Sequence, residues 1–397
     1  MLKIIYLHQY FKKPSMSGGV RSYEFAKRMV NDGHEVIMIT SDTVNDFSGW
    51  RVESFEGIQI HWVSVKYDNK FGFVQRILSF LKFILLSSFH ILKINSDLVY
   101  VTSTPLTIVI PAIIYKKIKK VPYVFEVRDV WPEVPIALGV IKNSFLKKSA
   151  YFLERLAYKN ARNIIALSPD MRSSIESRYK LDNIEVIPNA ADVSIFRNRA
   201  VNKNDPIYLK LNSIKERHNK VLFYTGTFGL VNNLKYLIKL ATFSKGELAI
   251  VIIGGGKEEI ELKILAKSLG VLDKTIYFVG RINKEQLYIP HNLFDMAIST
   301  VLPIKELYAN SANKVFDAFA SGTPLMINHG GWIKDIIENN KCGIALPEVA
   351  NQEAYDELYN FITNDDVMLT AKNNSEKLGD DEFNRDRLYR KLKKCIL

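Results

Sequence analysis

Short apolar runs alternate along the first part of the chain with longer segments whose apolar residues recur every three or four positions. Residues 3–7 form an apolar run, and residues 22–31 follow with the periodicity of a helix. A second apolar run, at residues 35–40, comes shortly after Gly33. The order strand, helix, strand predicts a βαβ unit with parallel strands. Ligands bind at the loop after the first strand of such a unit, so the chain opens with a candidate binding loop.

The alternation continues along the chain and starts again in its second half. Later apolar runs lie at residues 97–102, 122–126, 163–168, 220–225, 247–253, 276–281, 294–299 and 325–327. Two such series predict an α/β protein with two facing, doubly wound domains. Residues 197–220 lack periodicity and contain several Asn residues, as a linker would. The expected division is a first domain at residues 1–197, a linker at 198–219, a second domain at 220–375 and a C-terminal helix at 376–397.

Two glycine clusters follow predicted strands. Gly18 and Gly19 come after the first strand, but they lack the spacing of a dinucleotide fingerprint, which argues against NAD. On spacing alone, a plain tight turn explains them equally well. The glycines at residues 254–256 follow a strand of the second series, and such a cluster is only a weak indication of a cofactor loop.

A helix predicted at residues 313–320 carries a candidate anion site at its start. Lys314 and Asp317 lie three positions apart and therefore project from one side of the helix. The N–H groups of a helix N-terminus attract anions, Lys314 adds a positive charge, and Asp317 can accept hydrogen bonds from hydroxyls. Gly322 and Pro324 are expected to end the helix. The alternative is an ordinary surface helix with one Lys and one Asp.

A polar loop follows the strand predicted at residues 122–126. It places Arg128, Asp129, Trp131 and Glu133 at the carboxyl edge of the sheet, where α/β proteins form their sites. A sugar ring packs on an indole while its hydroxyls bond to carboxylates, so this set of side chains suits a saccharide. The alternative is a rim turn in which the charged residues pair with their neighbours.

The segment at residues 71–94 is strongly apolar. Its few polar residues, among them Arg76, Ser79, Lys82 and His90, fall on a narrow stripe at helical spacing. A wide apolar face beside basic residues is typical of a helix that lies in a membrane interface, and we favour that interpretation. The alternative is a helix buried between a sheet and its neighbours. The residues expected to contact the membrane are Phe73, Arg76, Phe80, Lys82 and Phe83.

Composition narrows the expected partners. The chain has 397 residues and a formal net charge of +12, which points to an anionic partner. No zinc pattern or basic recognition helix accompanies the charge, so nucleic acid is not expected. No uncharged apolar run is long enough to span a bilayer, and the N-terminus turns polar too early for a signal peptide. Cys342 and Cys395 lack metal-type spacing, and no Asp-x-Asp pair ends a strand, so we expect a reducing cytosol and no metal site.

Three motifs stand out against this background. They are Asn313-Lys314-x-x-Asp317-Ala-x-Ala-x-Gly322-x-Pro324 with Gly330-Gly331-Trp332, Arg128-Asp129-x-Trp131-Pro132-Glu133, and Pro188-Asn189-x-x-Asp192 with Phe196. Together they resemble glycosyltransferase family 4. More narrowly, they are similar to the bacterial polysaccharide branch that includes O-antigen N-acetylfucosaminyl transferases.

The resemblance implies a GT-B fold, in which two Rossmann-like domains face each other and a C-terminal helix crosses back onto the first domain. It implies a retaining sugar transfer that needs neither metal nor cofactor. The donor would be a nucleotide-diphosphate sugar, in this branch most often an N-acetylated hexosamine on UDP. The acceptor would be a lipid-diphosphate-linked saccharide of O-antigen, lipopolysaccharide or capsule synthesis. Such a protein would be cytoplasmic and peripherally bound to the inner face of the plasma membrane.

The resemblance also implies roles for single residues. Lys314 and Arg281 would stabilise the charge that develops on the leaving phosphate, and Asp129 is the third catalytic candidate. The residues expected at the donor are Gly18, Gly19, Gly226, Thr227, Asn313 and Asp317, the last of them at the ribose hydroxyls. Those expected at the acceptor are Arg21, Arg128, Trp131 and Glu133.

Two positions depart from the family pattern. Ala309 stands where the family usually has a glutamate, and Thr227 stands where a cation often follows the first glycine of the second domain. These changes put the usual sugar-hydroxyl contact in question and shift phosphate binding toward Lys314. A nucleotide-sugar 2-epimerase is one alternative function. A catalytically silent, membrane-associated subunit that binds nucleotide sugars is another, and Ala309 motivates it.

Overall fold

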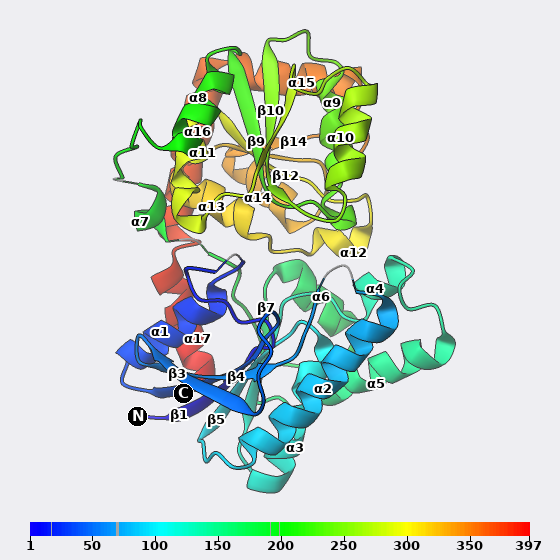
Figure 1. Cartoon of the computed structure of the whole chain (residues 1–397), viewed down its shortest axis with the longest axis vertical. Helices are drawn as coiled ribbons and strands as arrows, with labels where there is room; N and C mark the ends of the chain where they lie inside the picture. Colours follow the sequence, from blue (N-terminus) through cyan, green and yellow to red (C-terminus); the bar gives the residue numbers. More distant parts are fainter. Residues whose placement is uncertain (17, 69–70, 191, 198) are drawn as a thin grey trace. The chain divides into compact units, whose positions relative to one another are not determined.

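The computed structural model describes residues 1–16, 18–68, 71–190, 192–197 and 199–397. The chain folds into two compact units, Met1–Pro188 with Tyr389–Leu397, and Asn189–Leu388 (Figure 1). Each is an α/β unit around a largely parallel sheet, as the alternating pattern predicts. The last helix, α17 (Arg385–Ile396), starts in the second unit and ends in the first, so the predicted crossing back is confirmed.

The sheet of the first unit has eight strands, which are β1 (Lys3–Leu7), β2 (Glu35–Asp42), β3 (Trp50–Phe55), β4 (Ile58–Ser64), β5 (Leu98–Thr102), β6 (Tyr123–Val127), β7 (Asn163–Ala166) and β8 (Ile184–Val186). Their order is β3-β4-β2-β1-β5-β6-β7-β8, and only the β3–β4 pair is antiparallel. The central strands read as continuous apolar runs because helices cover both faces of the sheet, which leaves residues 4–7 fully buried.

The helices of this unit are α1 (Arg21–Asn31), α2 (Phe73–Ile91), α3 (Val109–Lys119), α4 (Glu133–Ala137), α5 (Ser144–Asn160) and α6 (Pro169–Arg178). On one face, α1 contacts the end of α17, where Tyr389 packs on Phe25 and donates a hydrogen bond to Asp32. On the other face, α2, α3 and α5 form a layer in which α3 contacts both of its neighbours (Figure 1). Right-handed crossovers explain the two faces, because the chain moves one way along the sheet from β1 to β2 and the opposite way from β5 to β7.

The sheet of the second unit is entirely parallel and consists of β9 (Lys220–Thr227), β10 (Leu248–Gly255), β11 (Ile276–Gly280), β12 (Met296–Ser299), β13 (Leu325–Ile327) and β14 (Gly343–Ala345). Their order is β11-β10-β9-β12-β13-β14. The chain starts in the middle of this sheet, at β9, and builds outward in both directions. The carboxyl ends of β9, β10, β11 and β13 therefore meet at one edge, which is where ligands bind in such sheets.

The helical elements of the second unit are α7 (Val193–Phe196), α8 (Pro206–Lys215), η2 (Leu230–Asn232), α9 (Leu234–Ala241), α10 (Glu259–Ser268), η3 (Lys284–Gln286), α11 (Tyr288–Leu293), α12 (Lys305–Tyr308), α13 (Asn313–Ser321), α14 (Trp332–Asn340), α15 (Gln352–Thr363) and α16 (Asp365–Asp381). Two apolar clusters hold them against the sheet. One joins α8, α11, α13 and α14, and the other joins α9, α10 and α15.

The irregular linker expected at residues 198–219 is wrong in part. Helix α8 lies within it, and the side chains of Leu211 and Ile214 are buried in the core of the second unit. Asp205 caps the helix by accepting a hydrogen bond from the N–H of Ile207. The sequence around the helix is polar, so its periodicity was not recognised. The burial of two apolar side chains is enough to hold the helix against the core.

The boundaries of the two compact units also differ from those of the expected domains. The first unit ends at Pro188 instead of residue 197, and the second continues to Leu388 instead of residue 375. The reason for the later boundary is that α16 packs along α13, so it belongs to the core of the second unit. Only the last part of the expected C-terminal helix, Tyr389–Leu397, joins the first unit.

Candidate active site

Helix α13 starts at the carboxyl edge of the sheet in the second unit. Its N-cap residue is Ala312, which has no side-chain acceptor for the first N–H groups of the helix. Those groups and the helix dipole therefore favour an anion at this position. Asn313 is exposed, Lys314 is half-buried and Asp317 is 8% exposed, so the predicted helix start is present but its acid is mostly buried.

Lys314 packs on an aromatic ring. Its Nζ lies 3.9 Å from the centroid of the Tyr224 ring, within the range of a cation–π contact. Burial lowers the pKa of Lys314 to about 7, and no neighbouring carboxylate of the described chain offsets that effect. A partly buried ammonium without a carboxylate partner among the described residues gains from an anionic ligand, so Lys314 is suited to bind phosphate.

The end of β9 with the turn that follows it, here called the Gly226 loop, lies beside Lys314. A Cβ atom built on Gly226 would lie 3.3 Å from Nζ of Lys314, and Gly226 has a φ of +150°, which side chains rarely adopt. The carbonyl of Thr227 accepts hydrogen bonds from the Tyr224 hydroxyl at 2.9 Å and from Asn232 at 3.0 Å. Tyr224 therefore positions both the lysine and the loop.

The triple glycine after β10 supports this loop. A Cβ atom on Gly254 would overlap the carbonyl oxygen of Gly226, and one on Gly256 would overlap the backbone of Phe228. The glycines are therefore needed for close packing of two backbones, as is common where a strand end approaches another loop. This explains the cluster without a cofactor.

Arg281 follows β11 at the same edge. A Cβ atom on Gly255 would lie 3.0 Å from Nε of Arg281 and 3.4 Å from a carboxylate oxygen of Glu259. The guanidinium of Arg281 therefore lies against Gly255. The adjacent residue, Gly254, packs on the Gly226 loop. The structure thus brings together three predicted donor-side elements: the start of α13, the Gly226 loop and Arg281.

Asp317 occupies a different environment from Lys314. Burial raises the pKa of Asp317 to about 6, and the nearby charges of Lys284, Arg385 and Asp192 modify it. Those three groups belong to η3, to the start of α17 and to the segment before α7. The carboxyl is thus buried near two cations, and the ribose contact expected of it stays a prediction.

The loop after β13 adds a histidine that the sequence did not single out. His329 is buried, its ring stacks on Tyr308, and its Nδ1 is 2.7 Å from the carbonyl oxygen of Gly330. Its Nε2 is buried without a hydrogen-bond partner among the described residues. The adjacent Gly330-Gly331 pair belongs to the predicted motif, and Gly331 starts α14 with a φ of +85°. The position of His329 directly before that motif was the one feature of the sequence that could have indicated it as a site residue.

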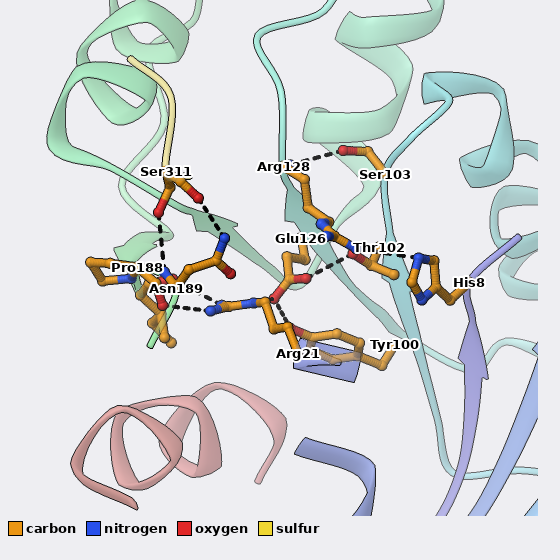
Figure 2. A network of polar contacts seen from close by, with 11 residues as sticks. His8, Arg21, Tyr100, Thr102, Ser103, Glu126, Arg128, Pro188, Asn189 and Ser311 are labelled. Carbon is orange, nitrogen blue, oxygen red and sulfur yellow. Dashed lines mark hydrogen bonds and ion pairs between the residues drawn. The ribbon is translucent and has the colours of Figure 1, made fainter. Parts of the chain in front are cut away.

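The segment before α13 is anchored within the second unit. Ser311 accepts a hydrogen bond from the N–H of Asn189, and its carbonyl accepts another from the Asn189 side chain (Figure 2). Trp332 donates from its indole to the carbonyl of Asn310 at 2.8 Å. Asn189 and Trp332, both members of the recognised motifs, therefore fix the approach to the helix start. Ala309, at the position of the family glutamate, is buried in this segment.

Arg21, expected at an acceptor, is instead buried inside the first unit. It is 3% exposed and pairs with Glu126 at 2.9 Å, and its guanidinium also donates to the carbonyls of Ile187 and Pro188 (Figure 2). Glu126 is completely buried and accepts further hydrogen bonds from Tyr100 and Thr102 at 2.7 Å each. The hydrogen bonds of Arg21 hold the end of the first unit in place and argue against an acceptor role, which stays a prediction.

The loop after β6 places Arg128 beside a second histidine. Nη1 of Arg128 is 3.2 Å from Nε2 of His8, which directly follows β1 (Figure 2). Burial and the adjacent guanidinium hold the pKa of His8 well below its usual value, so the ring is neutral and Nε2 accepts from Arg128. His8 is 4% exposed and its Nδ1 has no partner among the described residues. Asp129 is exposed and accepts a hydrogen bond from Thr104 at 2.8 Å.

Glu133 is drawn into a network between α4, α5 and α6. It accepts from the Tyr151 hydroxyl at 3.1 Å and pairs with Arg178 at 3.2 Å, and Arg178 also pairs with the buried Glu154. This carboxylate therefore holds helices together, and its assignment to the acceptor stays a prediction. Trp131 is half-buried at the edge of the loop. The acceptor-side set that remains on the surface of the first unit is Arg128, Asp129 and Trp131.

Gly18 and Gly19 lie in the loop between β1 and α1, at the carboxyl edge of the first sheet. Gly18 is exposed with a φ of +138°, and a Cβ atom on it would lie 3.1 Å from the Lys12 side chain. A substitution there would strain the loop. Their predicted contact with the donor remains a prediction.

Solved structures of the same architecture span almost the whole chain. WaaG, a glycosyltransferase involved in lipopolysaccharide biosynthesis, has a TM-score of 0.72 at 16% identity over 99% of both chains. Anabaena Alr3699/HepE, solved in complex with UDP and glucose, has a TM-score of 0.73 at 16% identity, again over 99% of both chains. At such identities these similarities establish the fold alone.

The sequence matches two families of glycosyltransferases. Residues 18–195 match Glycosyltransferase Family 4, and residues 210–378 match Glycosyl transferases group 1. Together the two matched segments span most of the chain, and the fold is the GT-B fold of glycosyltransferases. An uncharacterized glycosyltransferase of Methanocaldococcus jannaschii, MJ1607, is 23% identical over 58% of this chain and 57% of its own length. The chain thus spans somewhat more than half the length of the curated relatives that it matches.

Helix α2 differs from the expected membrane helix. Phe83 is completely buried and Phe80 is half-buried beside Tyr67, so the assignment of Phe83 to a membrane was wrong. Arg76 donates to the carbonyl of Phe71, and Lys82 is exposed. The side chain of Phe73 lies outside the described part of the chain. By length and composition alone, Val74–Ile91 could cross a membrane, a weak indication because a core helix passes the same test.

Metal-binding side chains do not cluster in the described part of this chain. Among those residues, no group of three or more His, Cys, Asp or Glu side chains is placed to hold a metal ion. The positive groups gathered at the donor-side edge are instead Lys314, Arg281 and the N–H groups of α13.

Proposed function

We propose that this protein is a glycosyltransferase that transfers a sugar from a UDP-sugar to a lipid-diphosphate-linked saccharide. The observation that carries the proposal is the position of Lys314, at the start of α13 and beside the Gly226 loop. A nucleoside diphosphate needs a site that binds phosphate through cations and N–H groups, and this edge of the second unit offers both. The HepE structure that contains UDP supports the choice of nucleotide.

The proposed chemistry rests on charge that develops during the reaction. Cleavage of the anomeric bond releases UDP, so negative charge grows on the β-phosphate oxygen in the transition state. Lys314, Arg281 and the first N–H groups of α13 would stabilise that charge, and groups already in place supply this stabilisation without reorganising. In this proposal Asn313 and Thr227 line the donor and Asp317 bonds to ribose hydroxyls. The transfer retains the anomeric configuration and uses no metal.

The proposed acceptor site lies on the first unit. Arg128 would bind a diphosphate or carboxylate of the acceptor, Trp131 would pack on a sugar ring, and Asp129 would accept a hydroxyl hydrogen bond. The motif that contains these residues resembles the polysaccharide branch, which supports an acceptor in O-antigen or capsule synthesis. WaaG, a neighbour by fold, takes part in lipopolysaccharide biosynthesis. A lipid-linked acceptor would place the protein at the cytoplasmic face of the inner membrane.

Mass spectrometry of acceptor and donor tests this function. Purified protein is incubated with a panel of nucleotide sugars and a short lipid-diphosphate saccharide, and parallel samples omit the acceptor. A gain of one sugar on the acceptor supports the transferase and names the donor. Conversion of the donor without acceptor would mark a 2-epimerase. Binding of a donor without conversion in either sample would mark a silent binding subunit.

A further inference from the structure

The outward face of α2 is apolar although it faces solvent. An exposed helix face is normally polar, because only the stripe that faces the core is apolar. The inward face of α2 mixes apolar residues with serines: Phe83 and Ile91 are completely buried, and so is Ser87. The exposed fractions on the outward face are 67% for Val74, 58% for Leu78, 49% for Leu81, 60% for Leu85 and 68% for Phe89. The larger apolar side chains of this helix therefore lie on the side that faces solvent as well as on the side that faces the core.

The exposed apolar surface continues across the layer of helices. On α5, Phe145 is 75% exposed and Phe152 is 63% exposed, and Ile118 at the end of α3 is 60% exposed. Because α3 contacts both α2 and α5, these side chains lie on one layer of the first unit (Figure 1). We call the exposed side chains of α2, α3 and α5 the α2–α5 face. Exposed apolar residues gathered on one layer mark an interaction surface rather than scattered surface residues.

The charge of the same layer is almost entirely positive. The three helices carry nine Lys and Arg residues and a single acid, Glu154. That acid is completely buried and paired with Arg178, so it does not reach the surface. The exposed basic residues of the layer are Lys82, Lys117, Lys119, Lys148, Arg155 and Lys159. The partner of the face must therefore offer both an apolar interior and negative charge.

We propose that the α2–α5 face binds the surface of an anionic lipid bilayer. Its apolar side chains would enter the boundary between headgroups and acyl chains, and the lysines and arginines around them would bind anionic headgroups. The aliphatic and aromatic side chains of the face match the apolar acyl region, and the basic groups around them match the negative headgroups. The helix lies along the bilayer and does not cross it, because its inward face packs in the core of the first unit.

This inference names the surface by which the protein would bind the membrane. It rests on the proposed function only in that a lipid-linked acceptor lies in a membrane. Of the side chains that the sequence suggested, the exposed Lys82 stays in the contact, and apolar side chains that the sequence analysis did not single out join it. Leu85 and Phe89 belong to it, whereas Phe83 does not. Binding to vesicles is measured without any turnover, so the membrane surface and the sugar transfer can fail independently.

Vesicle flotation tests the proposal with a matched control. The protein is mixed with vesicles of phosphatidylglycerol and phosphatidylcholine, or of phosphatidylcholine alone. The variant L85E/F89E should lose at least about tenfold in the bound-to-free ratio on anionic vesicles. The control I260E/I264E changes two side chains that are 76% and 64% exposed on α10 of the second unit, and it should bind as the wild type does. Both variants are checked for native far-UV circular dichroism.

Charge reversal and fluorescence complete the test. The variant K148E/R155E should weaken binding to anionic vesicles, and added salt should do the same to the wild type. The fluorescence of the tryptophan introduced in the variant F89W should be quenched more by lipids brominated near the headgroup than by lipids brominated at the chain ends. Absence of binding between wild-type protein and anionic vesicles would overturn the proposal. A wild-type dimer that the L85E/F89E substitutions dissociate would overturn it too, in favour of a protein partner. Equal loss of binding in I260E/I264E would overturn it too.

Discussion

Nζ of Lys314 lies 3.9 Å from the centroid of the Tyr224 ring. The two residues come from the start of α13 and the end of β9, which are far apart in sequence and adjacent at the carboxyl edge of the second sheet. The Tyr224 hydroxyl also bonds to the carbonyl of Thr227, so one aromatic residue positions both the cation and the glycine loop. The proposed donor site is organised around this contact.

The affinity for UDP should depend on pH through Lys314. Burial lowers its pKa from 10.5 to about 7, so the folded protein holds fewer protons than the unfolded chain between those values. The free energy of unfolding therefore gains a contribution that rises with pH in that window. UDP binding has the opposite trend, because it favours the protonated amine.

We expect the UDP affinity to fall above about pH 7, by at most about tenfold per pH unit. Isothermal titration calorimetry near pH 8, in two buffers of different ionisation enthalpy, should show proton uptake on binding. The variant Lys314→Met should bind without that uptake. An affinity that stays constant from about pH 6 to 9 would contradict this assignment.

Replacement of Tyr224 separates its ring from its hydroxyl. Tyr224→Phe keeps the ring under Lys314 and loses only the bond to Thr227, so UDP should bind only slightly more weakly. Tyr224→Leu removes the cation–π contact, which is worth about 0.5–2 kcal/mol, and UDP affinity should fall further. Affinities from calorimetry decide between them. Equal losses in the two variants would show that the hydroxyl, not the ring, supports Lys314.

A methyl group at Gly254 should displace the Gly226 loop. The added Cβ would overlap the Gly226 carbonyl, and Gly254 has a φ of +147°. We expect Gly254→Ala to lower the free energy of unfolding by more than about 2 kcal/mol and to weaken UDP binding. Gly270→Ala is the control, since Gly270 has a φ of +71° and open space around it, and it should cost about 1 kcal/mol. Urea titration measures both. A Gly254→Ala protein as stable as the control would refute the packing role.

The Arg21–Glu126 pair should behave as a structural element of the first unit. Arg21→Ala leaves a buried carboxylate and two carbonyls without their cation, which should cost about 3–5 kcal/mol of stability. The exposed Arg172–Glu176 pair is the matched control, and Arg172→Ala should cost less than about 1 kcal/mol. Urea titration compares the two. Loss of acceptor binding at unchanged stability would restore the ligand role that the structure argues against.

The pair also predicts acid sensitivity. Burial alone would raise the pKa of Glu126, but Arg21, Arg128 and the Thr102 hydrogen bond outweigh it, and the net shift is downward. The stabilisation is therefore complete above the usual carboxyl pKa and is lost as pH falls through the lowered value. The stability of wild type should drop in acid more steeply than that of Glu126→Gln.

The fold followed from local sequence signals where those signals were strong. Gly322 takes the left-handed conformation that ends α13, with a φ of +70°, as predicted from the Gly-x-Pro pattern. The β3–β4 hairpin was missed although Glu56-Gly57 supplies its positive-φ turn, because alternating, half-exposed strands give a weak apolar pattern. Helix α8 was missed because two buried side chains suffice to hold it.

The orientation of α2 could not be read from its pattern. Apolar residues lie on both faces of the helix, so the polar stripe seemed to mark the outside. Ser79 instead faces inward, where its hydroxyl donates to a backbone carbonyl, and His90 contacts His61 and stacks on Trp50. Polar groups that bond to the unit beneath them lie on the buried side, and that depends on tertiary structure.

The site shows the same limit. Lys314 and the glycine loop were predicted because each belongs to a local motif. The partners of Arg21, which include Glu126 and the carbonyl of Pro188, are distant in sequence, so its burial was not visible. Tyr224, His8 and His329 lie in or directly after apolar strands and carry no local motif of their own.

The most direct test of the account compares wild type with Lys314→Ala for sugar transfer to the lipid-diphosphate acceptor. Lys334→Ala is the control, because Lys334 is an exposed lysine of α14 in the same unit. The account predicts a mass gain of one sugar on the acceptor with wild type and control, and a rate about a thousandfold lower with Lys314→Ala at unchanged folding. Transfer by Lys314→Ala at the wild-type rate would contradict it.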